Sequence, residues 1–600
     1  MKTRLKIFTT ILYVLACCAF LPQMKAQLPP EIPGNPDGCY PNFTTAEGCN
    51  ALHQLFGGIG NTAVGWYANF LAGDASFNTS IGAGTLALTS GVGSGQNTAV
   101  GTAAMILNLS GNSNVAVGSN ALVNNSIGSF NNGVGAFVLY NNDSSGAGLG
   151  NDNNAFGDSA LFSNIDGAGN CAFGDGALFS SVITSDNTAI GRFALNSNDF
   201  FATGVAVHNT AVGSLALLLN TDSFNNTAVG AEALLGNDST DAGTANNNTA
   251  VGWRALRDNI NAGGNTAVGS LALRNNDAFG NNNATDNTAV GFQALNQNIE
   301  AFGNTAVGAF ALLNNDSTGN GLANRNTAVG VNALFNNIDG LENTAIGDQA
   351  LFDNTGNFNV AVGGAALLNN TTGNENTACG SGALNDTTGN DNTALGFQAG
   401  ILATTGDGNV YIGAGMSGAA GEANHTYVRN INTTSVNGMG TDTVTVNLTT
   451  GLLGHLSSSR RYKEDIKPMD KTSEALYMLN PVTYRFKKDI DPSQSLDYGL
   501  IAEEVAKVDP NLAIHDKNGQ IESVRYSAIN AMLLNEFLKE HSKVEEQQAK
   551  LEEQQVTIAQ LKTEVQTVVA KLKEQAGQIQ KVNAQLEVSK PAAQVVANKP

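Results

Sequence analysis

Charged and aromatic side chains are scarce in this chain. Only 14% of its 600 residues are Asp, Glu, Lys or Arg and only 6% are Phe, Trp or Tyr, whereas glycine occurs 68 times. A chain with so few large side chains cannot easily fill a wide globular core, but it can stack small residues in a narrow, repeated architecture. The composition therefore argues against an ordinary multidomain enzyme.

Basic residues are outnumbered by acidic ones, 30 to 51, and the sequence has no metal-ligating cluster. The net charge of −21 argues against nucleic acid as a partner, because phosphate binding needs a basic surface. The six histidines are scattered, and no group of Cys and His has the spacing of a zinc site. We therefore predict no metal and no cofactor.

Long apolar runs are absent beyond the first 20 residues, so no later transmembrane segment is predicted. A basic start, residues 1–6, precedes an apolar run over residues 7–20 that is too short to span a bilayer. This pattern is typical of a signal peptide over residues 1–26, with cleavage after Ala26 and export to the extracellular space or the cell surface. The alternative is a lipoprotein box, Val14-Leu15-Ala16-Cys17, which would anchor the chain at Cys17.

A five-residue unit, Asn-Thr-Ala-Val-Gly with close variants, recurs through residues 58–415, after a linker at residues 27–57. The glycine is followed by two variable residues, by Ala-Leu and by a turn rich in Asn, Asp, Gly, Ser and Thr. The spacing is mostly 17 residues, with several steps of 22 that alternate with 17 through the middle. Such self-similarity predicts stacked coils, because no repeat could bury its apolar side chains alone. The units begin at Asn61, Asn78, Asn97, Asn114, Asn131, Asn153, Asn170, Asn187, Asn209, Asn226, Asn248, Asn265, Asn287, Asn304, Asn326, Asn343, Asn359, Asn376, Asn392 and Asn409.

Each repeat offers two short extended pieces separated by a glycine. Side chains alternate along a strand, so Thr62 and Val64 point to one face and Ala63 to the other. We expect three chains to share their small Ala faces. We expect the extra residues of the longer steps to bulge outward. The leading Asn is expected either to form a hydrogen-bonded ladder along the stack or to satisfy a turn within its own coil.

These repeats resemble the β-roll heads of trimeric bacterial adhesins, whose repeats are of the type x-Val-Ala-Ile-Gly-x-x-Ser-x-Ala. The nearest match is Asn114-Val115-Ala116-Val117-Gly118-Ser119-Asn120-Ala121. The family's repeats are shorter than 17 residues, so the resemblance implies a β-roll fibre and a homotrimer but transfers no binding residue. A calcium-binding roll needs Gly-Gly-x-Gly-x-Asp, which is absent, and an ice-binding solenoid needs Thr-x-Thr, where this chain has Thr-x-Val.

The repeats stop near Gly415, and a connecting β stalk is predicted over residues 416–456, with a strand in Thr441-Asp442-Thr443-Val444-Thr445-Val446-Asn447. A charged segment follows, Ser458-Ser459-Arg460-Arg461-Tyr462-Lys463. A lysine can act as the general base for a serine nucleophile when nearby cations such as Arg460 and Arg461 lower its pKa, and an arginine can also stabilise an oxyanion. A polar linker that enters a basic helix start would have the same residues, so this pattern alone does not decide between the two.

The segment resembles the intramolecular chaperone, or peptidase S74, domain found at the ends of phage tailspikes and some membrane-bound transcription factors. That family has Ser-Asp-x-Arg-x-Lys near its start. Ser458, Arg461 and Lys463 match it, and Ser459 replaces the Asp. Three further motifs match in order, and the resemblance covers roughly residues 455–545, with the domain itself at 457–536. They are Leu479-Asn480-Pro481-Val482-Thr483-Tyr484-Arg485-Phe486, Tyr498-Gly499-Leu500-Ile501-Ala502-Glu503-Glu504-Val505 and Val524-Arg525-Tyr526.

The S74 resemblance implies cleavage between Ser457 and Ser458, with Ser458 as the nucleophile, Lys463 as its base and Arg461 beside them. The change from Asp to Ser459 leaves an uncleaved but folded chaperone as the alternative.

A heptad pattern follows over residues 537–588, and residues 589–600 are expected to form a disordered tail. An unbroken apolar series at the first heptad position predicts a coiled coil, and Gln at the fourth position is compatible with three strands. A single long surface helix is the alternative. The first-position residues are Phe537, Val544, Leu551, Ile558, Val565, Leu572, Ile579 and Leu586.

Together these features predict an exported, homotrimeric fibre that is mainly β and ends in a small α+β chaperone domain and a coiled coil. The C-terminal domain would drive trimerisation and cleave its own chain once, without an external substrate. One alternative is an uncleaved adhesin that binds a cell-surface or glycan ligand. Another is a phage-tailspike-like fibre that carries a glycan-binding or hydrolase activity; hydrolysis would need carboxylates placed in a groove.

Overall fold

The computed structural model describes residues 39–40, 42–434, 444–448, 450–455, 457–550 and 555–587. It divides into two units, Met1–Arg429 and Asn430–Pro600. The predicted signal peptide, Cys17 and the predicted tail at 589–600 lie outside the described residues. Among the described helices, none is both long and apolar enough to cross a bilayer.

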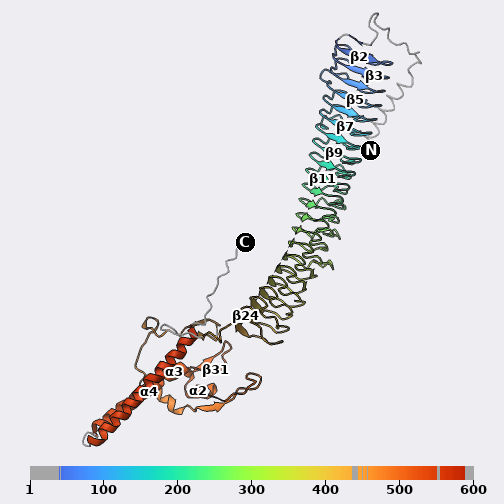
Figure 1. Ribbon diagram of the computed structural model, residues 1–600. Coiled ribbons are helices and arrows are strands. Elements are labelled where there is room, and N and C mark those ends of the chain that lie inside the picture. The colour runs from blue at the N-terminus through green and yellow to red at the C-terminus, as the bar shows by residue number, and fades with distance from the viewer. Residues whose placement is uncertain are drawn as a thin grey trace. The chain divides into compact units, whose positions relative to one another are not determined.

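The first unit is a parallel β-solenoid in which each coil adds one strand to a 23-stranded sheet (Figure 1). Equivalent residues pair in register, so Thr210, Ala211 and Val212 face Thr227, Ala228 and Val229. Strand β2 (Thr44–Glu47) starts the parallel stack, and β1 (Cys39–Tyr40) pairs with it antiparallel. A second small sheet joins β18 (Asn336–Asn337) to β20 (Asp353–Asn354). The predicted solenoid is confirmed.

The remaining strands of the stack are three residues long. They are β3 (Thr62–Val64), β4 (Thr79–Ile81), β5 (Thr98–Val100), β6 (Val115–Val117), β7 (Asn132–Val134), β8 (Asn154–Phe156), β9 (Cys171–Phe173), β10 (Thr188–Ile190), β11 (Thr210–Val212), β12 (Thr227–Val229), β13 (Thr249–Val251), β14 (Thr266–Val268), β15 (Thr288–Val290), β16 (Thr305–Val307), β17 (Thr327–Val329), β19 (Thr344–Ile346), β21 (Val360–Val362), β22 (Thr377–Cys379), β23 (Thr393–Leu395), β24 (Val410–Ile412) and β25 (Thr426–Val428).

The core of the solenoid lies inside a single chain. From β5 to β23 the strand Ala, where present, is fully buried in one core with the Ala-Leu pairs of the coils, for example Ala211 with Ala216 and Leu217. The second piece of each coil is a turn and not a strand, because residues such as Leu215 and Leu217 have φ values of 60° and 50°. The expectation that three chains share their Ala faces is therefore wrong, because the Ala side chains are already buried among the Ala-Leu pairs of their own chain.

In the main sheet a glycine follows each strand from β2 to β24, because the backbone there leaves no room for a side chain. Gly213 has a φ of +141°, a conformation that only glycine adopts readily. A Cβ atom on Gly213 would lie 2.4 Å from the carbonyl oxygen of Gly230 in the next coil. The glycine column thus allows the coils to approach each other closely.

Two ladders of buried Asn side chains run along the stack. In the first, the Asn209 Oδ1 atom accepts the backbone N–H of Asn226 at 2.9 Å, while its Nδ2 donates to the Ser223 carbonyl at 2.9 Å. In the second, Asn220 Nδ2 donates to Asn198 Oδ1 at 3.0 Å. The predicted ladder is confirmed, and the same side chains also satisfy turn carbonyls.

A buried Asp distinguishes the coils of 22 residues from those of 17. All five long coils carry an Asp directly after the Asn of the second ladder, and none of the 17-residue coils does. Asp238 Oδ2 accepts the backbone N–H of Asp222 in the preceding short coil at 2.8 Å, and Oδ1 accepts that of Gly243 in its own loop at 2.8 Å. The side chain therefore fixes the longer loop on a short neighbour. The five residues are Asp143, Asp199, Asp238, Asp277 and Asp316, all fully buried.

Aromatic residues replace Ala at the C-terminal end of the solenoid. Tyr411 occupies the inward position of β24 and is fully buried, and its ring stacks on Tyr427 of β25 with centroids 5.6 Å apart. Both hydroxyls donate to the Glu422 carboxylate, at 3.1 Å from Tyr411 and 2.8 Å from Tyr427. Burial, with these contacts to Glu422, raises the pKa of Tyr411.

The second unit is a small α+β arrangement. Its core contains Val505, Leu512, Val524, Ile529 and Met532. The predicted strand in the stalk is present. The segment predicted to form a coiled coil is helical in the described residues, although the helix begins before residue 537 and residues 551–554 lie outside the described part; its association into a coiled coil stays a prediction. The elements are β26 (Val444–Val446), β27 (Leu453–His455), η1 (Arg460–Tyr462), η2 (Asp470–Met478), β28 (Val482–Tyr484), β29 (Asp497–Gly499), α2 (Ala502–Val508), η3 (Pro510–Leu512), β30 (Ala513–His515), β31 (Ile521–Val524), α3 (Tyr526–Lys550) and α4 (Gln555–Glu587).

Candidate functional site

The three ordered motifs of the C-terminal unit meet at Gly499. Strand β28 pairs antiparallel with β29, which places Tyr484 beside the glycine. The Tyr526 hydroxyl, from the start of α3, accepts the backbone N–H of Leu500 at 3.0 Å. A Cβ atom on Gly499 would lie 2.9 Å from that hydroxyl and 3.2 Å from the Tyr484 ring. The glycine therefore lets segments distant in sequence pack together.

The segment predicted to be cleaved is exposed and follows the β26–β27 hairpin. Ser457 and Ser458 are both exposed. Ser459 is the N-cap of η1, and its Oγ accepts the backbone N–H of Arg461 at 3.4 Å and the Arg461 Nε at 3.2 Å. Ser and Asp are both favoured N-cap residues. Ser459, which replaces the family's Asp, is therefore a suitable cap at this position.

The predicted nucleophile and base are not in contact in the single chain. Ser458 and Lys463 are exposed, and neither side chain makes a hydrogen bond or ion pair with another described residue. Arg461 is bound to Ser459 and not to Ser458. Self-cleavage by these residues stays a prediction.

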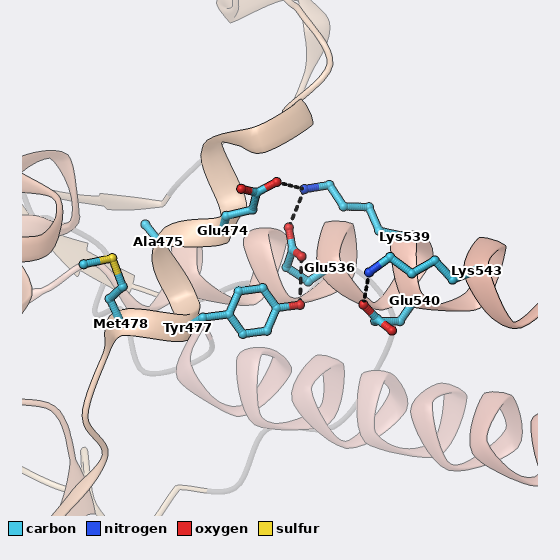
Figure 2. A pocket seen from close by; sticks show the side chains of 8 residues that line it. All are labelled: Glu474, Ala475, Tyr477, Met478, Glu536, Lys539, Glu540 and Lys543. Carbon is cyan, nitrogen blue, oxygen red and sulfur yellow. Dashed lines mark hydrogen bonds and ion pairs between the residues drawn. The ribbon is translucent and has the colours of Figure 1, made fainter.

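A polar cluster that the sequence did not indicate joins η2 to α3 (Figure 2). Glu536 is 8% exposed, and it accepts hydrogen bonds from Lys539 Nζ at 2.6 Å, from the Tyr477 hydroxyl at 2.9 Å and from Ser473 Oγ. Asn535 Nδ2 adds a bond to the Asp470 carbonyl at 3.0 Å. We call this group the Glu536 clamp.

The charges of the clamp stabilise each other. The hydrogen bond from Lys539, with those from Ser473 and Tyr477, lowers the pKa of Glu536 to about 2. The same bond raises the pKa of Lys539. The clamp lines a cavity of about 690 Å³, which Glu474, Met478 and Lys543 also border.

The clamp contains a serine and a lysine within hydrogen-bond distance, since Lys539 Nζ lies 3.3 Å from Ser473 Oγ. A lysine acts as a base only when it is neutral, and the Glu536 carboxylate keeps Lys539 protonated. The arrangement therefore fixes η2 on α3 and does not form a second catalytic pair. Among the described residues, no group of three or more His, Cys, Asp or Glu is placed to hold a metal ion.

Comparison with known proteins identifies this region. Residues 458–514 match the sequence profile of the peptidase S74 family, described as the chaperone of endosialidase. No curated protein and no solved structure matches the chain. The match starts at Ser458, the residue expected to follow the cleaved bond. A β-solenoid with such a segment fits a tail-fibre or endosialidase-like protein, and residues 458–514 carry the peptidase S74 chaperone sequence that the motifs indicated.

Proposed function

We propose that the protein is an exported, homotrimeric fibre whose C-terminal domain aligns three chains and then cleaves itself before Ser458. The observation that carries the proposal is the S74 match, which begins at Ser458 and follows a long regular solenoid. The domain acts on its own chain once, and no external substrate is invoked.

The regularity of the solenoid makes an alignment device necessary. The nine strands from β10 to β19 in the main sheet all have the sequence Thr-Ala-Val or Thr-Ala-Ile. Identical coils on neighbouring chains can pair at many offsets of similar energy, so the sheet itself specifies register weakly. A C-terminal trimerisation domain would fix one end and let the remaining coils associate in order.

The outward face of the strands supplies a surface for contact between chains. The first and third residues of the strands in the main sheet form two columns of side chains on this face. None of these residues is charged from β3 to β25, although residues 42–429 contain 27 acidic residues. Val229, Val251 and Val268, in the column of third residues, are 37–38% exposed. An exposed apolar surface of this length on a soluble protein is typical of an interaction site. This face replaces the Ala face as the proposed interface.

The second unit also presents apolar residues for helix association. Leu533, Leu534 and Leu538 on α3 are 52–55% exposed. In a three-stranded assembly these side chains would be covered by neighbouring helices. We propose that this association also brings Lys463 to Ser458, so that cleavage follows assembly and makes the fibre hard to dissociate.

Denaturing electrophoresis with N-terminal sequencing tests the cleavage. The wild-type protein should give fragments 27–457 and 458–600, and Ser458→Ala and Lys463→Ala should remain intact. Ser457→Ala and Lys467→Ala are matched controls that should still be cleaved. A new N-terminus at any residue other than Ser458, or no cleavage at all, would contradict the proposal.

Sedimentation equilibrium on the intact Lys463→Ala protein tests the oligomeric state separately. A mass of three chains is expected, because this substitution removes the base without changing the apolar faces. A monomer or a dimer would refute the trimeric fibre.

A further inference from the structure

One 19-residue coil of the solenoid carries a short insertion relative to the 17-residue coils. The step from Asn78 to Asn97 spans 19 residues, a length found nowhere else between Asn61 and Asn409. Its extra residues form a loop at residues 90–95, in which Val92 is 86% exposed. A cleft of about 480 Å³ opens beside this loop. In repeat proteins, an insertion on one face of the stack often forms the binding surface.

Exposed aromatic rings border the cleft. Phe77 and Phe130 are 54% and 55% exposed, and each immediately precedes an Asn of the first ladder. They are three coils apart, a separation of about 14 Å at the usual strand spacing. Gln96 and Ser113 occupy the same position in the two coils between them, and Ser113 Oγ donates to Gln96 Oε1 at 3.2 Å. The cleft thus has a polar middle between two apolar ends.

Polar groups in the cleft lack protein partners. Elsewhere in the solenoid, an Asn two residues before a ladder Asn accepts a backbone N–H from the preceding coil through its side-chain oxygen. Asn151 accepts that of Ser129 at 2.7 Å, and Asn324 accepts that of Phe302 at 2.9 Å. Asn112 occupies this position, but its carboxamide makes no hydrogen bond with any described residue. The same is true of Gln96 Nε2 and of the Asp74 carboxylate. These groups are available to a ligand.

We propose that this cleft binds a short, uncharged oligosaccharide. Aromatic faces pack on the apolar C–H faces of sugar rings, and carboxamides and a carboxylate bind their hydroxyl groups. The cleft contains Asp74 and no Lys or Arg, which disfavours phosphorylated or acidic sugars. Its volume lies within the range of small-ligand sites. The inference gives the proposed fibre a ligand class, but it depends on neither trimerisation nor cleavage.

Isothermal titration calorimetry on the full-length mature protein tests the proposal. The probes are maltotriose, cellotriose, mannotriose and N-acetylchitotriose, with trigalacturonate as the acidic comparison. At least one neutral trisaccharide should bind with a Kd of about 1 mM or tighter. Phe130→Ala should raise that Kd at least about tenfold, and Asn112→Ala should raise it roughly two- to tenfold. Because the Asn112 carboxamide has no protein partner, the second variant should keep the stability of the wild type.

Phe358→Ala is the matched control. Phe358 also precedes a ladder Asn and is 47% exposed, but it lies outside the cleft, so its removal should leave the Kd unchanged. Binding of none of the neutral sugars, equal binding of trigalacturonate, or a Kd unaffected by Phe130→Ala would overturn the proposal. The electrophoresis described above would still show whether the chain cleaves itself, so the two proposals can fail separately.

Discussion

Removing coils in pairs should shorten the solenoid without loosening it, whereas removing one coil should weaken a specific contact. Asp316 in a long coil accepts the backbone N–H of Glu300, in the short coil before it, at 2.7 Å. Deletion of residues 265–303 removes one long and one short coil. The coil of Asp316 would then lie after the short coil that contains Asn261. In the wild type the Asn261 N–H donates to Asp277, the equivalent of Asp316, at 2.8 Å, so Asp316 would gain the same kind of bond.

Deletion of residues 287–303 alone removes the short coil and places two long coils next to each other. Asp316 then keeps its bond from Gly321 but loses the one from Glu300. A buried polar group without its partner costs about 1–3 kcal/mol. The loop that follows Asp316 should therefore open more easily, which corresponds to hydrogen exchange roughly five- to a hundredfold faster.

Hydrogen–deuterium exchange of residues 316–325 measures this opening, and small-angle X-ray scattering measures the length. The pair deletion should shorten the solenoid by about 10 Å, two strand spacings, with exchange at the wild-type rate. Equal exchange in the two deletions would refute the role assigned to Asp316. Unfolding of the pair deletion would refute the independence of the coils.

Three further outcomes are expected. Ala267→Glu should unfold the surrounding coils within one chain, because Ala267 is fully buried and the new charge would have no partner; limited proteolysis of this variant beside the wild type would detect the unfolding. Burial raises the pKa of Asp238, Asp277 and Asp316, so their contribution to stability is greatest below pH 3.8, the ordinary pKa of Asp, and is lost as the pH rises through the higher folded values. Protection factors in these loops, which correct for the intrinsic pH dependence of exchange, should therefore rise on acidification. The Glu536 clamp behaves oppositely, since a pKa of about 2 against 4.5 unfolded makes its contribution complete above pH 4.5 and lost toward pH 2, an effect that Glu536→Gln should abolish in an acid titration followed by NMR.

The sequence predicted the stacking of the coils and the direction of the strand side chains, because both follow from periodicity. It did not predict what covers Ala211. That residue is buried in a core with leucines such as Leu217, whose φ of 50° is rare for a non-glycine residue and has no signature in composition. The same turn conformation explains why the second extended piece of each repeat is not a strand.

Some residues of the candidate site could likewise be predicted from the sequence and others could not. Ser458 and Lys463 could be proposed because they belong to one short motif. Ser473 and Glu536 could not, because they are 63 residues apart and only tertiary packing joins them. The insertion beside the proposed binding cleft can be seen in the sequence as the single 19-residue step at Asn78. The spacing alone does not show that the Asn112 carboxamide lacks a partner.

The tyrosine pair at the end of the solenoid affects whether the last strand can pair with the first strand of another molecule. The last strand of a parallel stack is an open edge that could template the first strand of another molecule. Burial acts to raise the pKa of Glu422, but hydrogen bonds from the Ala419 backbone and from Tyr427 and Tyr411 lower it overall, so the carboxylate stays ionised. An incoming coil would have to cover this charge. The same side chains that complete the core thus disfavour end-to-end growth of the solenoid.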